Sequence, residues 1–306
     1  MTFDVVAQLT ASGLVTGFFY SVMAIGFALI IATTGRFHFA FGIVYALAGY
    51  LVFTGTERLG LPFYLTVVLT AAIAAGLGMA IEMYLYRPLE KRAGRGALLA
   101  IFITALGITL LGQNVVKLIW GPSDLVLQSL PITPYSWGPV SFVGFDIGQV
   151  ITGIVIITAT VIVLRTTNLG RRILAVKSNP NLAAAGGLAP ERVFLIVFAI
   201  GSAMSVFAGM WQYAKFSISA QMGFAPTLTA FVIAFIAGLQ LKPMRLVAWS
   251  FTIALAERYV TIWLDVAWSK LVVLVGLLIY LVFLSARTAG LGQRIERYFA
   301  RGQVSA

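Results

Sequence analysis

Two glutamates lie inside apolar runs of the sequence, where a carboxylate can relay a proton or hold an ion pair between helices. Glu82 stands near the end of one run, in GMAIEMYLYRPLEKR, and Glu257 stands deeper in another, in IALAERYV. An ionisable group at the bilayer centre costs about 3 kcal/mol, so each needs a compensating partner. We interpret both as structural acids. Glu82 can pair with Arg87 or extend to the interface, and Glu257 is expected to pair with another helix, because the adjacent Arg258 points elsewhere.

Three further polar side chains have largely apolar surroundings. His38 is the one histidine of the chain, within GRFHFAFGIVYALAGY at residues 35–50, and a lone histidine serves packing more often than chemistry. Gln113 and Asn114 lie toward the end of another apolar run, in ITALGITLLGQNVVKLIWG. Such amides bond to neighbouring helices or line a hydrated path, and the residues alone leave both interpretations open.

The usual signatures of catalysis and of metal binding are missing from the sequence. The 306 residues contain no cysteine and one histidine, which excludes disulfides, thiol chemistry and a histidine-rich metal centre. No serine nucleophile stands with a plausible base, and GRRILAVKS lacks the spacing of a phosphate-binding loop. We therefore expect no enzyme and no cofactor bound by this chain. Any transport against a gradient then takes its energy from an ion or from another chain.

The elements that carry these side chains are predicted to be membrane helices. Hydrophobic residues make up 60% of the chain and charged residues 10%, and the mean hydropathy is +0.98, outside the range of soluble domains. Apolar runs of about 20 residues recur, each long enough to cross about 30 Å of hydrocarbon as a helix. The sequence predicts an all-α polytopic membrane protein with about nine transmembrane helices, at residues 8–33, 39–55, 62–86, 97–119, 147–164, 193–213, 225–241, 246–264 and 267–286. The second is short enough to be a re-entrant or broken element instead.

Basic residues orient these helices. Most of the 21 lysines and arginines follow the first, third, fifth, seventh and ninth helices, including Arg36 and those of the tail at 287–306. The opposite loops carry acids such as Asp124. By the positive-inside rule the basic side is cytoplasmic, so we predict the N-terminus outside and the C-terminus inside. The net charge of +11 therefore needs no nucleic-acid partner.

Two connections are long enough to have a function of their own. The outer segment 120–146 is rich in proline and glycine and has no lysine or arginine between 121 and 144. It is either a structured loop or a landing surface for an external partner. The other is the cytoplasmic insert 166–192, TTNLGRRILAVKSNPNLAAAGGLAPER.

Capping residues predict that this insert is a rigid pair of short helices. Asn168 can cap a helix over 169–177, and Asn179 can cap a second helix that has Pro180 at its first position. The glycines at 186–187 supply the stop. The outer positions are then small or basic, which suits the docking of another protein and equally suits contact with anionic lipid headgroups.

Four stretches of the sequence together follow a known pattern. They are GLVTGFFYSVMAIGFALIIATTGRFHFAFGIVYALAGY, RPLEKR with ITALGITLLGQNVVKLIWGP, TNLGRRILAVKSNPNLAAAGGLAPERVFLIVFAIGSAMSVFAGM, and TAGLG. With them the chain resembles the permease subunits of bacterial ABC importers of the branched-chain amino acid type, in particular the shorter of the two paired permeases. The likeness runs from about Gly13 to Gly292. It departs from the family pattern at His38 and Phe41 in HFAFG, and at residues 238–248, which read GLQLKPMRLVA.

The resemblance implies one permease domain over residues 1–306, in a bacterial inner membrane, and a set of partners. A second permease, either a longer relative or another copy, would complete the path for a small organic solute. A branched-chain amino acid is the first candidate, and urea or a short amide are alternatives. Two cytoplasmic ATPases would use ATP and Mg²⁺ and grip the insert, while a periplasmic binding protein would deliver the solute.

The resemblance also suggests roles for particular residues. The surface that couples to the ATPases would comprise Gly170, Arg171, Arg172, Ala175, Asn179, Pro180, Ala183, Ala184 and Gly187. The candidates for lining or gating the path are Phe37, His38, Phe39 and Phe41, together with Gln113 and Asn114.

Two other classes of membrane protein compete with this interpretation. An ion-coupled secondary transporter or channel should carry several ion ligands inside its helices, whereas Glu82 and Glu257 are the only acids within these runs. An intramembrane enzyme needs a nucleophile or a metal set, which the sequence does not offer.

Overall fold

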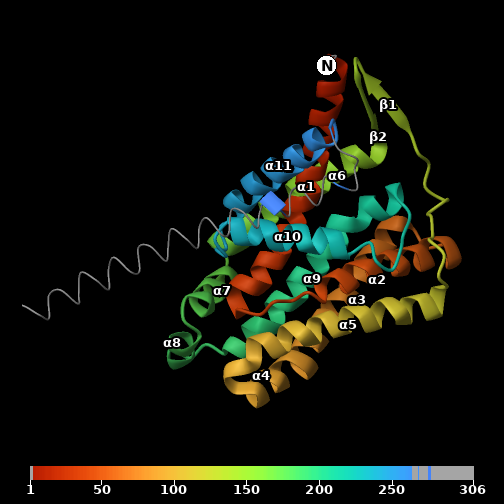
Figure 1. The fold of residues 1–306 in the computed structure, drawn as a ribbon. Coiled ribbons are helices and arrows are strands. Elements are labelled where there is room, and N and C mark those ends of the chain that lie inside the picture. The colour runs from red at the N-terminus through yellow and green to blue at the C-terminus, as the bar shows by residue number, and fades with distance from the viewer. Residues whose placement is uncertain (1–2, 264–267, 269–274, 277–306) are drawn as a thin grey trace, which may run out of the picture. The chain divides into compact units, whose positions relative to one another are not determined.

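The computed structural model describes residues 3–263, 268 and 275–276. It comprises two units, Met1–Leu255 and Ala256–Ala306, each considered by itself. Figure 1 shows that the described part of the first unit is built mainly of helices. The predicted ninth span falls almost wholly outside the described residues, and the TAGLG stretch and the tail at 287–306 fall outside them entirely.

Within the described part of the chain, five helices are long and apolar enough to cross a membrane. They are α1 (Phe3–Thr34), the continuous helix Phe63–Ala93, α5 (Ala97–Trp120), α6 (Gly144–Thr166) and α9 (Pro190–Lys215). Each coincides with a predicted span, so the structure agrees with an all-α polytopic membrane protein.

Three more helices are shorter or less apolar. They are α2 (Phe41–Phe53), α10 (Phe224–Ile236) and α11 (Pro243–Val260). The 13 residues of α2, at a rise of about 1.5 Å each, reach only about 20 Å, less than a bilayer core of roughly 30 Å. A π-helical turn, η1 (Thr54–Arg58), continues it directly, so the helical element covers residues 41–58 and changes its helix type at Thr54. The alternative of a re-entrant or broken second element stays a prediction.

The second half of α1 is the most enclosed part of the first unit. Residues 19–31 are buried without interruption, and α1 packs against α9, α10 and α6. Small residues permit the closest of these approaches, because a Cβ added at Gly201 of α9 would lie 2.8 Å from the carbonyl oxygen of Gly26 on α1. Contacts between small residues are a general device for packing membrane helices.

The helix Phe63–Ala93, α5 and α6 instead present large apolar side chains at the surface. Side chains such as Leu110 and Leu118 on α5, and Ile151 on α6, are more than a third exposed. A helix that is apolar on its exposed face suits contact with lipid tails, which are themselves as apolar as leucine. The exposed faces of α5 and α6 are therefore suited to contact with lipid, whereas the second half of α1 lies inside the protein.

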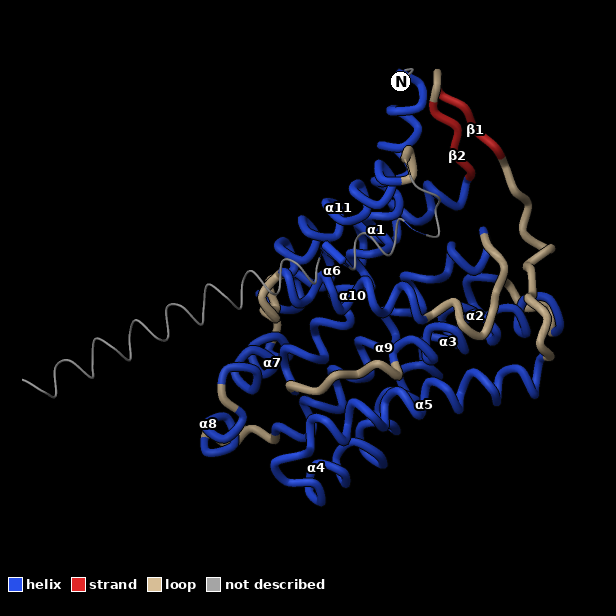
Figure 2. The backbone as a smooth tube through the Cα atoms, viewed as in Figure 1, coloured by secondary structure: helices blue, strands red, loops and turns tan. Residues whose placement is uncertain are grey.

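The outer segment 120–146 contains a β-hairpin, which the sequence analysis did not predict. Strand β1 (Pro134–Trp137) pairs antiparallel with β2 (Val140–Val143), as the red tube in Figure 2 shows. Gly138 begins the turn with a φ of +58°, a conformation that glycine adopts without steric cost. Short strands in which polar and apolar side chains do not alternate clearly are hard to predict from a sequence.

The earlier part of the outer segment is hydrogen-bonded to η1, the π-helical turn after α2. The carboxylate of Glu57 accepts hydrogen bonds from the backbone N–H groups of Gln128 and Ser129, at 2.7 and 2.8 Å, and from the Ser129 hydroxyl at 2.8 Å. Leu125 also pairs with Ile218 in an isolated β-bridge. These contacts make the segment a structured loop.

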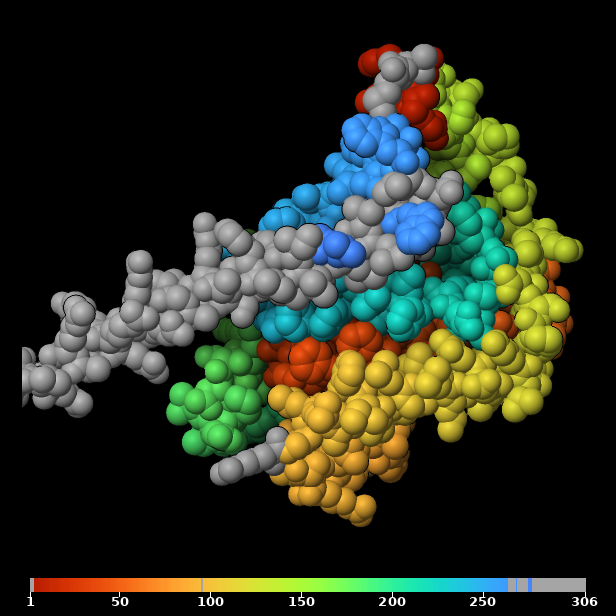
Figure 3. Space-filling model, viewed as in Figure 1, coloured from red at the N-terminus to blue at the C-terminus, as the bar shows by residue number. Residues whose placement is uncertain are grey.

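The insert at residues 166–192 forms two short helices, α7 (Asn168–Ser178) and α8 (Pro180–Ala185). In Figure 1 they lie with α4 (Arg87–Ala93) at one end of the first unit, away from the hairpin. Figure 3 shows the green atoms of the insert protruding at the surface beside the gold atoms of α4. The two parts of the chain that the sequence assigned to the basic, cytoplasmic side therefore lie together.

Candidate functional site

Arg36 begins the turn between α1 and α2, and its side chain is only 2% exposed. Its guanidinium forms ion pairs with the carboxylates of Glu82, which is fully buried, and of Glu90, which is about half exposed. Its carbon Cζ also lies 5.1 Å from the ring centroid of Phe194. Glu82 therefore pairs with Arg36 and not with Arg87, the partner suggested by the sequence.

The polar side chains that hold this turn come from a π-helical stretch. Residues Ile81–Tyr86 (η2) are π-helical and join α3 (Phe63–Ala80) to α4. Glu82, at the start of η2, reaches Arg36. Tyr86, at its end, places its hydroxyl 2.9 Å from Nδ1 of His38. Such π-turns recur at functional sites, and this one directs two polar groups at one short loop.

His38 is completely buried within a cage of aromatic rings. Its ring centroid lies 4.9 Å from that of Phe198, 5.6 Å from Tyr86 and 6.2 Å from Phe41. Phe41 is also fully buried. In this conformation both side chains pack inside the protein, so a role in lining the path requires the turn to move.

Phe37 and Phe39 are placed differently, because they are half-buried at the edge of a larger aromatic cluster. Phe39 lies 5.2 Å from Phe102 of α5 and 5.3 Å from Phe231 of α10, measured between ring centroids. Phe37 stacks on Phe235, also of α10, at 6.1 Å. The turn, α5 and α10 thus share a partly exposed aromatic surface, which we call the aromatic surface (Phe37, Phe39, Phe102, Phe231 and Phe235).

The amides of α5 do not join this surface by any described contact. Asn114 is exposed and donates to the carbonyl of Leu110 in its own helix at 2.8 Å, and Gln113 is half-buried. Thr109 is the α5 residue that reaches the turn, with its hydroxyl 3.3 Å from the carbonyl oxygen of Phe39. Thr109 was not among the residues predicted to line the path, because a threonine in a helix usually bonds its own backbone, as this one also does to the carbonyl of Ala105 at 2.9 Å.

The caps of the cytoplasmic insert agree with the sequence at α8 and differ at α7. Asn179 accepts a hydrogen bond from the backbone N–H of Leu182 at 3.0 Å, with Pro180 at the first helical position, as predicted. At α7 the cap is Thr167, whose hydroxyl accepts from the backbone N–H of Gly170 at 3.1 Å. Asn168 is already helical and accepts instead from Arg171. The prediction of Asn168 as the cap was wrong by one residue.

A Schellman motif ends α8. Gly187 has a φ of +83°, its N–H donates to the carbonyl of Ala184, and the N–H of Leu188 donates to that of Ala183, both at 3.0 Å. This pattern satisfies the last carbonyls of the helix. Both ends of α8 are therefore fixed by hydrogen bonds, so the insert is a preformed element.

The residues predicted for ATPase coupling fall into two groups, one buried and one exposed. Gly170 and Ala183 are buried and pack the insert onto the protein. The others are exposed: Arg171, Arg172, Ala175, Asn179, Pro180, Ala184 and Gly187. Leu182, which is 71% exposed on α8, was missed because a single leucine in NLAAA is typical of an inward-facing position.

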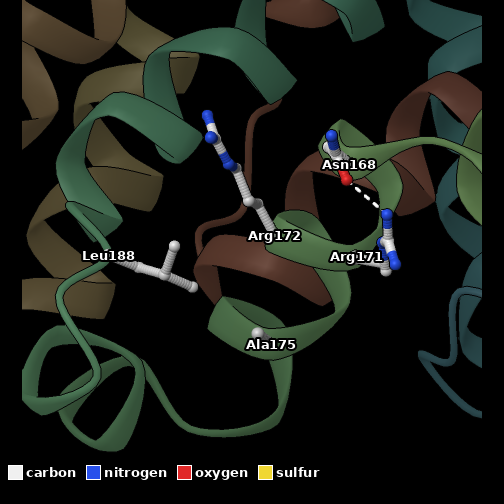
Figure 4. A pocket seen from close by; sticks show the side chains of 5 residues that line it. All are labelled: Asn168, Arg171, Arg172, Ala175 and Leu188. Atoms are coloured by element: carbon white, nitrogen blue, oxygen red, sulfur yellow. Dashed lines mark hydrogen bonds between the residues drawn. The ribbon is translucent and has the colours of Figure 1, made fainter.

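An open hollow of about 460 Å³ lies on this face of the insert. It is lined by Asn168, Arg171, Arg172, Ala175 and Leu188. Figure 4 shows Leu188 directed from the connection after α8 toward α7, with Arg171 turned to Asn168. The lining has two cations and no acid, so the hollow is suited to an acidic side chain of another molecule.

Glu257 lies on α11, beyond the boundary of the first unit. Its assignment as a structural acid stays a prediction.

The comparisons with known proteins agree with one another. A family model described as a branched-chain amino acid transport system permease component matches residues 9–282. The high-affinity branched-chain amino acid permease LivH of Escherichia coli K12 is 28% identical over 297 residues, covering 91% of this chain and 94% of LivH. BraD of Pseudomonas aeruginosa, which carries the same description, is 26% identical over 247 residues, with coverages of 76% and 79%.

A solved structure supports the fold. PsaBC from Streptococcus pneumoniae, in complex with Fab, superposes with a TM-score of 0.50 at 14% sequence identity, over 88% of this chain and 89% of that one. At so low an identity the likeness concerns the fold alone. The family model, by contrast, spans most of the sequence, including the turn, η2 and the insert. The chain therefore belongs to the family of branched-chain amino acid transport system permease components, and it is a transmembrane permease subunit of an ABC importer.

Proposed function

We propose that this chain and a second permease subunit form the path by which a small organic solute enters across a bacterial inner membrane. A branched-chain amino acid is the first candidate, since LivH and BraD are described as permeases for that class. Urea and short amides remain alternatives within the same class of importer. The N-terminus lies outside and the C-terminus in the cytoplasm, an orientation that follows from the positions of the basic residues.

The observation that carries the proposal is the preformed insert. Two separate ATPase subunits grip α7 and α8, and ATP with Mg²⁺ is used by them rather than by this chain. The caps and the Schellman motif make α8 stiff enough to transmit a displacement. Small exposed residues such as Ala184 allow close approach, and the hollow with Arg171 and Arg172 offers a site for an acidic partner group. The six residues of α8 present too little apolar area for stable lipid binding alone.

The aromatic surface is the basis for placing the solute path. Phe37 and Phe39 belong to a turn that interrupts the helices, and both are partly exposed. We place the solute path along this surface, with His38 and Phe41 entering its lining when the turn moves. The outer hairpin, where Trp137 is 83% exposed, is the corresponding landing surface for a periplasmic binding protein.

Reconstitution tests this function directly. The chain is purified alone and together with a second permease and an ATPase of the same importer, and each preparation is placed in liposomes with the matching binding protein. We expect uptake of labelled leucine that requires ATP and the ATPase. Uptake by this chain alone, driven by a proton or sodium gradient, would instead show an ion-coupled transporter.

A further inference from the structure

Arg36 connects the turn between α1 and α2 with two distant parts of the chain, the consecutive elements η2 and α4 and the helix α9. It pairs with Glu82 of η2 and Glu90 of α4, and it lies over the ring of Phe194 on α9. The Arg36–Glu82 pair is buried, whereas Glu90 is about half exposed. Charges in a desolvated pair interact more strongly than charges at a surface, so Arg36 is held firmly at its inner end.

A second ion pair continues from α4 to α9. Nη1 of Arg87 lies 2.9 Å from the carboxylate of Glu191, and Nη2 lies 3.1 Å from the backbone carbonyl of the same residue. Arg87 and Glu90 are three residues apart on α4, which makes them neighbours on the helix surface. The pairs Glu82–Arg36–Glu90 and Arg87–Glu191 are therefore joined through the short helix α4, which carries Arg87 and Glu90, and by no described ion pair between those two residues.

The two ends of this series lie at the two functional regions of the first unit. At one end, Glu191 belongs to the first turn of α9, which is separated from α8 by only four residues. That short connection is itself restrained by the hydrogen bonds of Gly187 and Leu188. Near the other end, Arg36, which is paired with Glu82, directly precedes Phe37 of the aromatic surface in the chain. A displacement of α8 thus has a short, charged route to the turn.

We propose that Arg36, Glu82, Glu90, Arg87 and Glu191 form an ion-pair relay that carries movement of the insert to the turn between α1 and α2. The relay positions the turn, and it makes the opening of the solute path depend on the state of the ATPases. It rests on the proposed function, because it requires ATPases docked at α7 and α8. A merely structural clamp would stabilise the protein without setting how much solute enters per ATP.

The outer links of the relay are suited to mutation because the side chains of Glu90 and Glu191 are more than half exposed and that of Arg87 is partly exposed, so that the protein still folds. Arg87→Gln and Glu90→Gln are compared with Arg92→Gln, which removes a charge from an exposed position of the same helix. Each variant is assembled with the second permease and the ATPase in proteoliposomes, and labelled leucine uptake is measured against ATP hydrolysed. We expect both relay variants to keep hydrolysing ATP while uptake per ATP falls roughly fivefold or more, and Arg92→Gln to match the unmodified protein.

A variant that keeps the charge separates the relay from a loss of stability. Arg87→Lys retains a cation opposite Glu191 and beside Glu90, and we expect it to recover much of the uptake per ATP that Arg87→Gln loses. Unchanged uptake per ATP in Arg87→Gln and Glu90→Gln would overturn the relay, as would an Arg87→Lys variant no better than Arg87→Gln.

Introduced cysteines distinguish failure of the relay from failure of the proposed function. The chain has no cysteine, so Leu182→Cys on α8 and Phe39→Cys in the turn each report alone through their rate of reaction with a maleimide. We expect the bound ATPase to slow the reaction of Leu182→Cys with the maleimide. We expect MgATP to change the reaction rate of Phe39→Cys, and this change to disappear when Arg87→Gln is also present. Absence of protection at residue 182 would refute ATPase docking and the relay with it. If the ATPase protects the cysteine at residue 182, and MgATP still changes the reaction rate at residue 39 in the Arg87→Gln background, the relay is refuted but ATPase docking is not.

Discussion

The phenolic hydroxyl of Tyr86 lies 2.9 Å from Nδ1 of His38, within a region where both side chains are buried. Because the hydroxyl is the described hydrogen-bond partner of that nitrogen, Tyr86→Phe leaves a buried polar group unpaired. We expect this variant to lower the free energy of unfolding by about 1–3 kcal/mol. Thermal unfolding in detergent measures it. Tyr84→Phe is the matched control, since Tyr84 is 70% exposed on the same π-helical stretch and should change stability little.

The buried pair of Arg36 and Glu82 predicts that a variant lacking one of the two charges is less stable than a variant lacking both. Glu82→Leu alone leaves a buried arginine with less compensation, and we expect a loss of about 3–5 kcal/mol. Arg36→Met together with Glu82→Leu removes both charges and should recover much of that loss, since apolar side chains of similar volume replace them. Equal Tm values for the single and double variants would contradict a buried ion pair.

The crossing of α1 and α9 predicts a strict size limit at Gly201. A Cβ there would lie 2.7 Å from Cδ1 of Ile30 and 2.8 Å from the carbonyl oxygen of Gly26. Gly201→Ala should therefore destabilise the protein by about 1–3 kcal/mol, the usual cost of overpacking. Gly107→Ala on α5 is the control, because a Cβ there meets nothing within 4 Å, and alanine should raise stability by up to about 1 kcal/mol. Thermal unfolding of both variants checks the sign of each effect.

The attachment of the outer segment should depend on pH through Glu57. Burial by itself raises the pKa of Glu57, but hydrogen bonds donated by Ser129 and Gln128 outweigh it and hold the pKa below its ordinary value of 4.5. A carboxylate with a lowered folded pKa contributes its stabilisation above the unfolded pKa and loses it as the pH falls through the folded one. We therefore expect the segment to be held at neutral pH and to loosen below about pH 4.

Limited proteolysis of the outer segment, with a protease active in acid, measures this attachment. Cleavage should accelerate as the pH falls, and Glu57→Gln should cleave quickly at every pH. A Glu57→Gln variant that keeps the same pH profile as the unmodified protein would show that another group controls the segment.

The helical architecture and the insert could be predicted from sequence because their signals are local. Long apolar runs marked the five long helices, and Asn179 followed by Pro180 marked the start of α8. The start of α7 was placed one residue late because Thr167 and Asn168 can both cap a helix. Contacts with α6 decide between them, since the Thr167 hydroxyl also donates to the carbonyl of Val163 at 2.7 Å.

The interior of the candidate site could not be predicted in the same way. Arg36 and Glu82 are 46 residues apart in the chain, and their meeting depends on a π-helical stretch that has no local sequence signature. Burial of His38 and Phe41 likewise depends on how α9 packs against the turn. The aromatic character of the turn was visible in the sequence, whereas its division into enclosed and partly exposed rings was not.

The measurement that tests the central claim most directly is solute uptake per ATP after replacement of residues 181–185 on α8 with bulky charged residues. The complex with the second permease and the ATPase is reconstituted, and ATP hydrolysis and labelled leucine uptake are followed in the same liposomes. We predict that the variant still inserts into the membrane while uptake falls to background and no longer follows ATP hydrolysis. Normal uptake per ATP with this altered surface would contradict the assignment of α7 and α8 as the point at which ATPases drive the permease.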